Sequence, residues 1–166
     1  MDNLINWKKG AFSCAFKLFQ EGQQIGRLKS KSLGQSAEGE IGGKTYGFNT
    51  YGILNKRSEI LDGRDGSVLG EIVLNCWGTK ADIYIGEKKF QWKFSNAWQS
   101  RWKVWNEKGT EIMYKGWTSR GSWHGGNGET EDILQLSGLF IANMLWESAM
   151  IAFIPIYVLP LLPIWF

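Results

Sequence analysis

Apolar and polar residues alternate along most of the first 120 residues, in short runs that are separated by polar turns containing glycine. In one run, Phe90, Trp92 and Phe94 fall on the same side. Gln91 and Lys93 fall on the opposite side. A period of two is typical of β-strands that bury one face and leave the other in water. The pattern therefore predicts antiparallel sheets.

Four segments repeat a strand–turn–strand pattern, at residues 15–31, 59–75, 81–94 and 101–117. Their turns contain Asp, Asn and Gly, which adopt the backbone conformations that tight hairpins require. In the second segment, Val68, Ile72 and Leu74 are expected to share one face. This spacing of turns implies about eight to twelve strands, which is typical of a barrel or a sandwich.

The chain loses this alternation after residue 132. Residues 132–154 are almost entirely apolar and contain no proline, which predicts a helix beginning near Asp132 and ending near Pro155. Thr130 is the expected N-cap. We expect a glycine-rich loop at 116–131 before the helix and an apolar, proline-containing tail at 155–166 after it. The whole chain, 1–166, is interpreted as one domain with its strands in 10–120.

The apolar helix has two possible surroundings, a lipid bilayer or the interior of its own protein. Its length suits a bilayer, but Glu147 lies near its middle with Asn143 one turn earlier, and an ionised group at that depth costs at least about 3 kcal/mol. A wide barrel, in contrast, needs a plug. In that arrangement Asn143 and Glu147 form a buried polar seam, and Glu147 meets a basic or hydrogen-bonding group on a strand.

Segments such as "SEILDGRDGSVLGEI", "RWKVWNEKGTEIMYKG" and "FQWKFSNAWQSRWKV" resemble the tubby C-terminal-like superfamily, which groups tubby domains, LURP-one-related proteins and phospholipid scramblases. The resemblance covers residues 10–155 and implies a closed antiparallel β-barrel wrapped around a hydrophobic C-terminal α-helix. It gives no residue-by-residue match to phosphoinositide-binding positions. The terminal "PIYVLPLLPIWF" departs from the pattern, which keeps a membrane contact open.

The formal net charge of +3 is unevenly distributed. Residues 1–128 contain all 19 Lys and Arg and 12 of the 16 Asp and Glu, which gives a net charge of +7 and leaves −4 for the remainder. A basic body suits anionic partners such as phospholipid headgroups, although a solvated surface of mixed sign explains the same charge. The candidate basic surface comprises Lys88, Lys89, Lys93, Arg101 and Lys103.

Residues with catalytic or metal-binding chemistry are sparse. His124 is the single histidine, and Cys14 and Cys76 lack metal-ligand spacing and are expected to be small buried side chains. Of the crowded tryptophans, Trp92 and Trp102 are assigned to the core by alternation. We therefore expect no catalytic constellation, no metal and no cofactor.

Three functional readings remain open. The first is a non-enzymatic binding module at an anionic membrane surface, recognising phospholipid or phosphoinositide headgroups. The second is a protein-interaction domain using an exposed apolar patch at Trp98, Trp105 and Trp165-Phe166. The third is a tail-anchored membrane protein with a cytosolic β-domain. The absence of a signal-peptide pattern predicts a cytoplasmic location, with membrane association through the C-terminal segment. A diffuse basic charge argues against nucleic acid as a partner.

Overall fold

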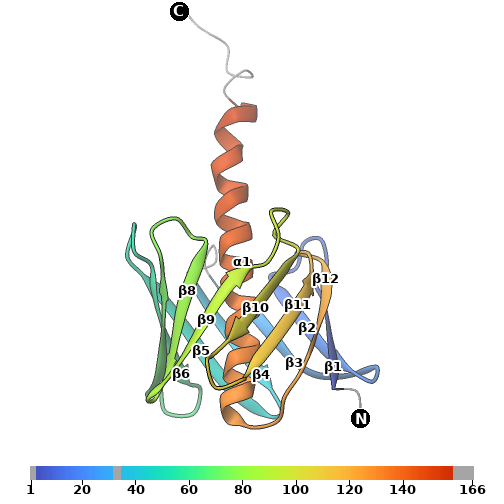
Figure 1. Ribbon diagram of the computed structural model, residues 1–166. Helices are drawn as coiled ribbons and strands as arrows, with labels where there is room; N and C mark the ends of the chain where they lie inside the picture. Colours follow the sequence, from blue (N-terminus) through green and yellow to red (C-terminus); the bar gives the residue numbers. More distant parts are fainter. Residues whose placement is uncertain (1–2, 32–34, 159–166) are drawn as a thin grey trace, which may run out of the picture.

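The computed structural model describes the backbone of residues 3–31 and 35–158, and the side chains as far as residue 152. Twelve antiparallel strands form a closed barrel, and a single long helix runs through it and leaves at one end (Figure 1). The strands are β1 (Leu4–Lys8), β2 (Ala15–Gln20), β3 (Gln23–Ser30), β4 (Ser36–Ile41), β5 (Lys44–Tyr51), β6 (Arg57–Asp62), β7 (Val68–Leu74), β8 (Lys80–Ile85), β9 (Lys88–Phe94), β10 (Arg101–Trp105), β11 (Glu111–Gly116) and β12 (Arg120–His124). The helix is α1 (Glu129–Val158).

Each strand pairs with its neighbours in the chain, and β1 pairs with β12 to close the barrel. The predicted fold class, a closed antiparallel barrel around a C-terminal helix, is confirmed. All four predicted hairpins form, as the pairs β2–β3, β6–β7, β8–β9 and β10–β11. Because every connection between strands is short and antiparallel, successive turns alternate between the two ends of the barrel.

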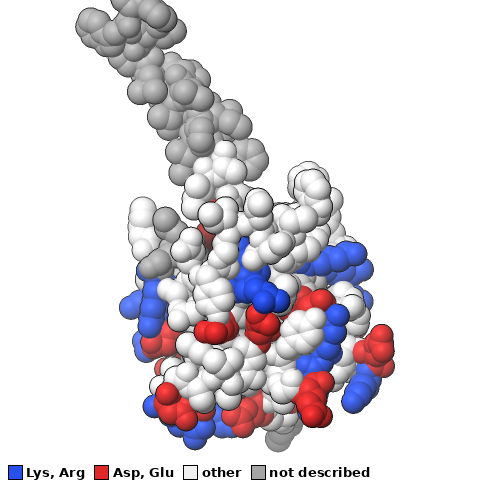
Figure 2. Space-filling view, turned by 90° about the vertical axis from the view of Figure 1, so that its left-hand side faces the viewer, with Lys and Arg blue, Asp and Glu red and all other residues white. Residues whose placement is uncertain are grey.

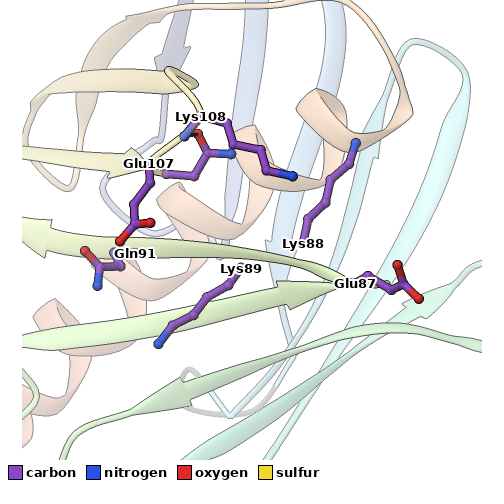
Figure 3. Close-up of a pocket in the computed structure, with 7 residues that line it drawn as sticks. Glu87, Lys88, Lys89, Gln91, Glu107 and Lys108 are labelled. Carbon is purple, nitrogen blue, oxygen red and sulfur yellow. Dashed lines mark hydrogen bonds between the residues drawn. The ribbon is translucent and has the colours of Figure 1, made fainter.

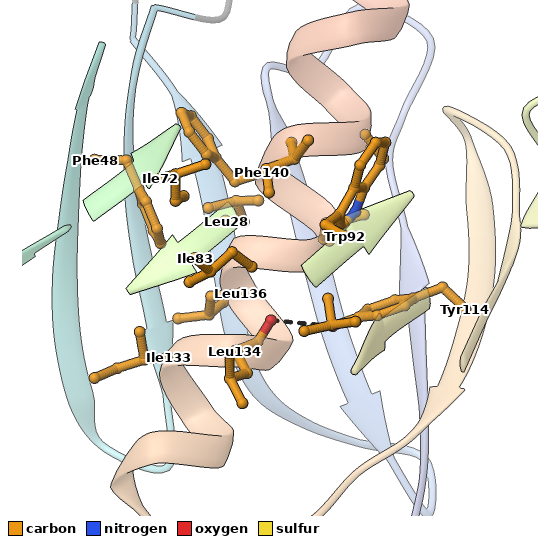
Figure 4. Packing of buried hydrophobic residues seen from close by; sticks show 14 of the residues in the cluster. Leu28, Phe48, Ile72, Ile83, Trp92, Tyr114, Ile133, Leu134, Leu136 and Phe140 are labelled. Carbon is orange, nitrogen blue, oxygen red and sulfur yellow. Dashed lines mark hydrogen bonds between the residues drawn. The ribbon is translucent and has the colours of Figure 1, made fainter. Parts of the chain in front are cut away.

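The part of α1 inside the barrel is buried on every side, from Ile133 to Met144. A helix without a polar face belongs in such an apolar interior. Rings from the strands pack directly on it, as in the stacked pair of Phe48 and Phe140, whose ring centroids lie 4.6 Å apart (Figure 4). The helix thus supplies the centre of the core that twelve strands cannot fill alone.

Hydrogen bonds from side chains of the barrel wall fix the position of the helix along the barrel axis. The Trp92 Nε1–H donates to the carbonyl oxygen of Gly138 at 3.1 Å. The Tyr114 hydroxyl lies 3.1 Å from the carbonyl oxygen of Leu134 (Figure 4). A Cβ at position 138 would overlap the Tyr114 hydroxyl, so glycine is needed for this close approach. Burial raises the pKa of Tyr114 well above its ordinary value, which keeps the hydroxyl protonated as a donor.

The expected loop at 116–131 is wrong over part of its length. Residues 120–124 form β12, which pairs with both β1 and β11. Clustered glycines are typical of loops, but here a Cβ at Gly121 would overlap the Trp7 ring. Gly121 therefore makes room for a buried tryptophan inside a strand. The barrel also begins earlier than predicted, at β1.

The helix boundaries also differ from the prediction of 132–154. The helix begins at Glu129, so that Thr130 lies inside its first turn and cannot be the N-cap. Three acidic side chains occupy this turn, where the helix dipole favours negative charge. The helix continues through Pro155 to Val158, since a proline removes one backbone donor without necessarily ending a helix. The rest of the predicted tail, 159–166, lies outside the described residues.

Two predictions of burial are wrong for local reasons. Val68 does not share the inner face with Ile72 and Leu74, because the β6–β7 register shifts between Ile60 and Leu61 and turns Val68 outward. Cys14 and Cys76 are exposed, since both lie in turns between strands.

Candidate functional site: the apolar rim and the helix mouth

Six turns surround the end of the barrel through which α1 leaves, and we call them the apolar rim. Their described residues are 9–14, 31, 35, 52–56, 75–79, 95–100 and 117–119. The helix beyond Trp146 stands above this rim, and we call residues 147–152 the emergent segment (Figure 1). The turns at the opposite end, which we call the polar rim, span 21–22, 42–43, 63–67, 86–87, 106–110 and 125–128.

Exposed apolar side chains are concentrated at one end of the molecule. Of the twelve large apolar side chains that are exposed among the described residues, nine lie on the apolar rim, at the adjoining end of β5 or on the emergent segment. They are Phe12, Tyr51, Ile53, Leu54, Trp77, Trp98, Trp117, Met150 and Ile151. In Figure 2, uncharged side chains gather around the emerging helix, and charged ones begin below them. At the polar rim, the turns have no exposed large apolar side chain among their described residues, and the adjoining strand ends have two, Val68 and Tyr84.

In two turns of the apolar rim, asparagine side chains accept hydrogen bonds that fix the turn around an exposed tryptophan. Asn75 accepts from the backbone N–H groups of Thr79 and Lys80 at 2.9 and 3.1 Å. Asn96 accepts in the same way from Ser100 and Arg101. These contacts close each turn from within. Trp77 and Trp98, which lie two residues after the asparagines, therefore project into solvent with exposures of 83% and 78%.

Positive charge forms a band directly beneath the apolar rim. The rim turns, together with the two adjoining residues of each strand, contain eleven Lys or Arg and no Asp or Glu. We call these side chains the basic collar: Lys8, Lys9, Lys29, Lys31, Lys56, Arg57, Lys80, Lys93, Arg101, Lys115 and Arg120. The emergent segment adds one acidic residue, Glu147, to this end. At the polar rim, the turns, the two adjoining residues of each strand and the first four residues of α1 contain five basic and ten acidic residues. The two ends of the barrel thus carry opposite net charge.

The predicted basic surface is divided by the fold. Lys93 and Arg101 belong to the basic collar, whereas Lys88 and Lys89 begin β9 beside the polar rim. Lys103 lies midway along β10 and pairs with Glu111 at 3.3 Å. The five residues therefore do not form one surface.

Lys88 and Lys89 instead line a hollow of about 280 Å³ that also contains Glu87 and Glu107 (Figure 3). Lys89 forms a 3.2 Å ion pair with Asp82, and the hydrogen bond from this pair raises the pKa of Lys89. Acidic side chains thus offset the lysines, which makes this hollow a poor site for an anion.

The expected protein-contact patch is also divided. Trp98 is exposed on the apolar rim, but Trp105 is partly buried beneath the ammonium groups of Lys93 and Lys103, at 5.5 and 4.8 Å from the ring centroid. Trp165-Phe166 lies outside the described residues. Sequence reasoning missed the other apolar side chains of the rim, because they come from separate turns that only the barrel brings together.

The polar seam lies where α1 leaves the barrel. Asn143 is buried and donates from Nδ2 to Ser30 Oγ at 2.9 Å and to Glu147 Oε1 at 3.0 Å. Glu147 is partly buried, and Lys9 lies nearby with its Nζ 3.9 Å from Glu147 Oε1. The basic group is thus in the turn that follows β1, at the rim of the barrel.

A pocket of about 460 Å³ opens at this point, and we call it the mouth pocket. Its polar wall includes Lys9, Thr118, Asn143 and Glu147, and its apolar wall includes Trp146 and the emergent Met150 and Ile151.

Among the described residues, no group of three His, Cys, Asp or Glu side chains is arranged to hold a metal ion. Nor does any helix in the described residues combine the length and apolarity that crossing a membrane requires. His124 is exposed at the end of β12, beside the polar rim. Comparisons of the chain with protein-family models, with curated proteins and with solved structures found no match, so the resemblance to the tubby-like superfamily stays a prediction.

Proposed function

We propose that this protein is a binding module that attaches end-on to an anionic membrane surface through its apolar rim. The observation that carries the proposal is the separation of side chains between the two ends of one barrel. Apolar groups and basic groups collect at the end where the helix emerges, and acidic groups collect at the other. This end of the barrel is the surface that we expect to contact the membrane.

The apolar side chains supply the first part of the attraction. Aromatic side chains with a polar edge, such as Trp77 and Trp98, favour the boundary between lipid headgroups and acyl chains. Burying one large apolar side chain there stabilises attachment by about 1.5–3 kcal/mol. The emergent segment adds Met150 and Ile151 at the centre of the ring. Several such contacts together are enough for stable but reversible attachment.

The basic collar supplies the second part. A Lys or Arg close to an anionic bilayer contributes about 1 kcal/mol, and this contribution decreases as salt increases. Three members of the collar, Lys9, Lys31 and Lys56, lie in the rim turns, and the others lie in the two strand residues that adjoin the turns, which is the level of the headgroups when the rim is inserted. The acidic polar rim then faces away from the membrane, so the charge of the whole molecule favours a single orientation.

The shape of this end favours a bilayer over a protein partner. Among the described residues, exposed apolar side chains come from five of the rim turns, and the rim turns surround the projecting helix. A fluid bilayer accommodates both the ring and the helix at its centre. A protein partner would need a socket for the helix within a matching apolar ring. A complex of that kind is the alternative outcome of the experiment below.

Co-sedimentation with vesicles tests the proposal. We expect the protein to bind vesicles of phosphatidylcholine with phosphatidylglycerol more strongly than vesicles of phosphatidylcholine alone, and added salt should reduce the difference. The variant carrying Phe12→Ser and Trp77→Ser should bind at least about tenfold more weakly, since each substitution removes an inserted ring. The control carries Val68→Ser and Met113→Ser, which remove exposed apolar side chains away from the rim, and should bind as the unaltered protein does.

Two results would overturn the proposal. One is an absence of binding to either kind of vesicle. The other is equal loss of binding in the rim variant and in the control, because general surface apolarity would then explain attachment. If the rim variant instead changed only self-association or the capture of a protein, the apolar rim would be a protein interface.

A further inference from the structure

Two buried acceptor oxygens lie where α1 leaves the barrel. Both donor hydrogens of the Asn143 amide are directed to Ser30 Oγ and Glu147 Oε1. The remaining oxygens, Asn143 Oδ1 and Glu147 Oε2, are buried and meet no donor among the described residues. Buried acceptors without donors are costly, and one of these belongs to a side chain that is only 1% exposed. Their position indicates a ligand that brings its own donors.

The surroundings of these oxygens define what such a ligand must look like. Asn143 and Glu147 form part of the wall of the mouth pocket, which opens at the apolar rim. Glu147 is an acidic residue in this pocket, and a carboxylate favours a cationic donor. The apolar wall of Trp146, Met150 and Ile151 lies along the emergent segment. The ligand therefore has a cationic donor at one end and an apolar part at the other.

Lys9 adds a requirement for negative charge. Its Nζ lies 3.9 Å from Glu147 Oε1, which is beyond hydrogen-bonding distance, and 4.7 Å from the centroid of the Phe16 ring. The ammonium thus lies at the pocket, held over an aromatic face, with its hydrogen-bonding capacity available. Thr118, on the same wall, adds a hydroxyl. A phosphate beside the cationic donor would meet both groups.

We propose that the mouth pocket binds the headgroup of a phospholipid that carries a primary ammonium, as in phosphatidylethanolamine. The ammonium donates to Asn143 Oδ1 and Glu147 Oε2, and the phosphate accepts from Lys9 and Thr118. The glycerol and the first part of the acyl chains lie along Trp146 and Met150. This inference rests on the proposed function, because the pocket opens at the surface that is proposed to meet the membrane.

A choline headgroup cannot supply hydrogen-bond donors to the acceptor oxygens of this wall. Its quaternary nitrogen has no N–H, so both buried oxygens would remain without a hydrogen-bond donor. Recognition of a quaternary ammonium usually depends on several aromatic faces, and Trp146 is the one aromatic side chain among the described residues that line the pocket. The number of N–H donors on the headgroup is therefore the expected basis of selection.

The test compares two series of vesicles with the same fraction of phosphatidylglycerol, one completed with phosphatidylcholine and the other with phosphatidylethanolamine. Both neutral lipids are zwitterionic, so the surface charge is matched. We expect about tenfold tighter binding to the ethanolamine series, the effect of one or two charge-assisted hydrogen bonds. In Glu147→Gln this preference should be lost, while binding to the choline series is retained. Glu38→Gln, on β4 outside the pocket, should keep the preference.

A second variant guards against misfolding of the first. Thr118 is exposed, so Thr118→Trp should fill the pocket without disturbing the core and should also abolish the preference. Adding dissolved phosphoethanolamine to the binding assay tests whether the pocket binds a free headgroup instead of a lipid. It should compete only weakly, because it lacks the part that lies on Trp146.

The outcomes separate this inference from the proposed function. Equal binding to both series by the unaltered protein overturns the pocket assignment but leaves membrane attachment standing, whereas no binding to either overturns attachment. A preference that survives in both Glu147→Gln and Thr118→Trp reflects lipid packing and also overturns the pocket. If dissolved phosphoethanolamine saturates the pocket and the protein shows no preference for the ethanolamine vesicles, the ligand is a soluble molecule, and the assignment of a lipid is overturned.

Discussion

The two rims of the barrel use closely similar turns to present opposite side chains. At the apolar rim, Asn75 and Asn96 close five-residue turns with a tryptophan at the third position. At the polar rim, Asn106 closes a turn of the same length by accepting from the backbone of Lys108 and Thr110 at 3.1 and 2.9 Å. The third position of that turn is Lys108.

The requirements of folding do not explain the difference between the two rims. Because the asparagine contacts close a turn with either side chain at its tip, the backbone does not explain why one rim carries tryptophan and the other lysine. A tryptophan that is mostly exposed buries little apolar area, so it adds little to the stability of a turn in water. Under the proposed function, the difference between the rims reflects what each end of the barrel meets.

The largest expected effect is on the free energy of unfolding, when a buried residue of α1 is truncated. The comparison of the rims assumes that α1 is enclosed at the polar rim and emerges at the apolar rim. Leu136 is fully buried and packs against Gly39 of β4. Leu136→Ala should lower the free energy of unfolding by about 2–5 kcal/mol. Ile151→Ala, on the emergent segment, should change it by less than about 0.5 kcal/mol in solution. Equal effects in denaturant titrations would contradict a helix that is half enclosed and half free.

Exchanging the residues at the tips of the turns should give the next largest effect. Trp98→Lys should weaken binding to anionic vesicles by about tenfold, since one inserted ring is lost. Lys108→Trp places the same ring on the polar rim and should leave binding unchanged. The measurement is vesicle co-sedimentation, with thermal melts to confirm that both variants fold. If Lys108→Trp strengthened binding, the two ends would not differ in orientation toward the membrane.

The smallest expected effect concerns a turn of the polar rim. Hydrogen bonds from the Arg64 guanidinium, and then from its backbone N–H, lower the pKa of Asp62 from an ordinary 3.8 to about 2. A lowered pKa in the folded state contributes stability above the ordinary value, and this stability is lost as the pH falls from about 4 to 2. Arg64→Ala should raise the pKa of Asp62 partway, because the backbone donor remains. NMR titration of the Asp62 carboxyl group measures it, and an unchanged pKa would contradict the assigned cause.

Much of the barrel could be predicted from the sequence, because alternation and turn residues are local signals. The inner positions Phe90, Trp92, Trp102 and Val104 follow directly from a period of two. The closing strand could not be found in this way. Its glycine, Gly121, makes room for the ring of Trp7, which comes from a distant part of the chain, and only the folded barrel shows that. The outward position of Val68 could not be predicted for a similar reason, since a bulge depends on how two strands pair.

The candidate site was harder to predict than the fold. Asn143 and Glu147 were identified because polar residues in an apolar helix are conspicuous, but the position of Lys9 beside them depends on where β1 ends. The apolar rim was missed because its side chains are scattered over more than a hundred residues. One signal was present in the sequence: in an antiparallel meander, alternate turns share an end. Sorting the turns in this way separates Phe12, Trp77 and Trp98 from the charged turns.

The order of elements along the chain has a consequence for how this protein reaches its folded state. All twelve strands precede α1, yet α1 supplies the centre around which their inner faces pack. During synthesis the barrel wall therefore emerges before the element that fills it. Closure also joins β1 to β12, two strands separated by more than a hundred residues. Such distant pairings delay folding, so we expect a slow, late collapse in which the hydrophobic faces of the strands stay exposed until the helix arrives.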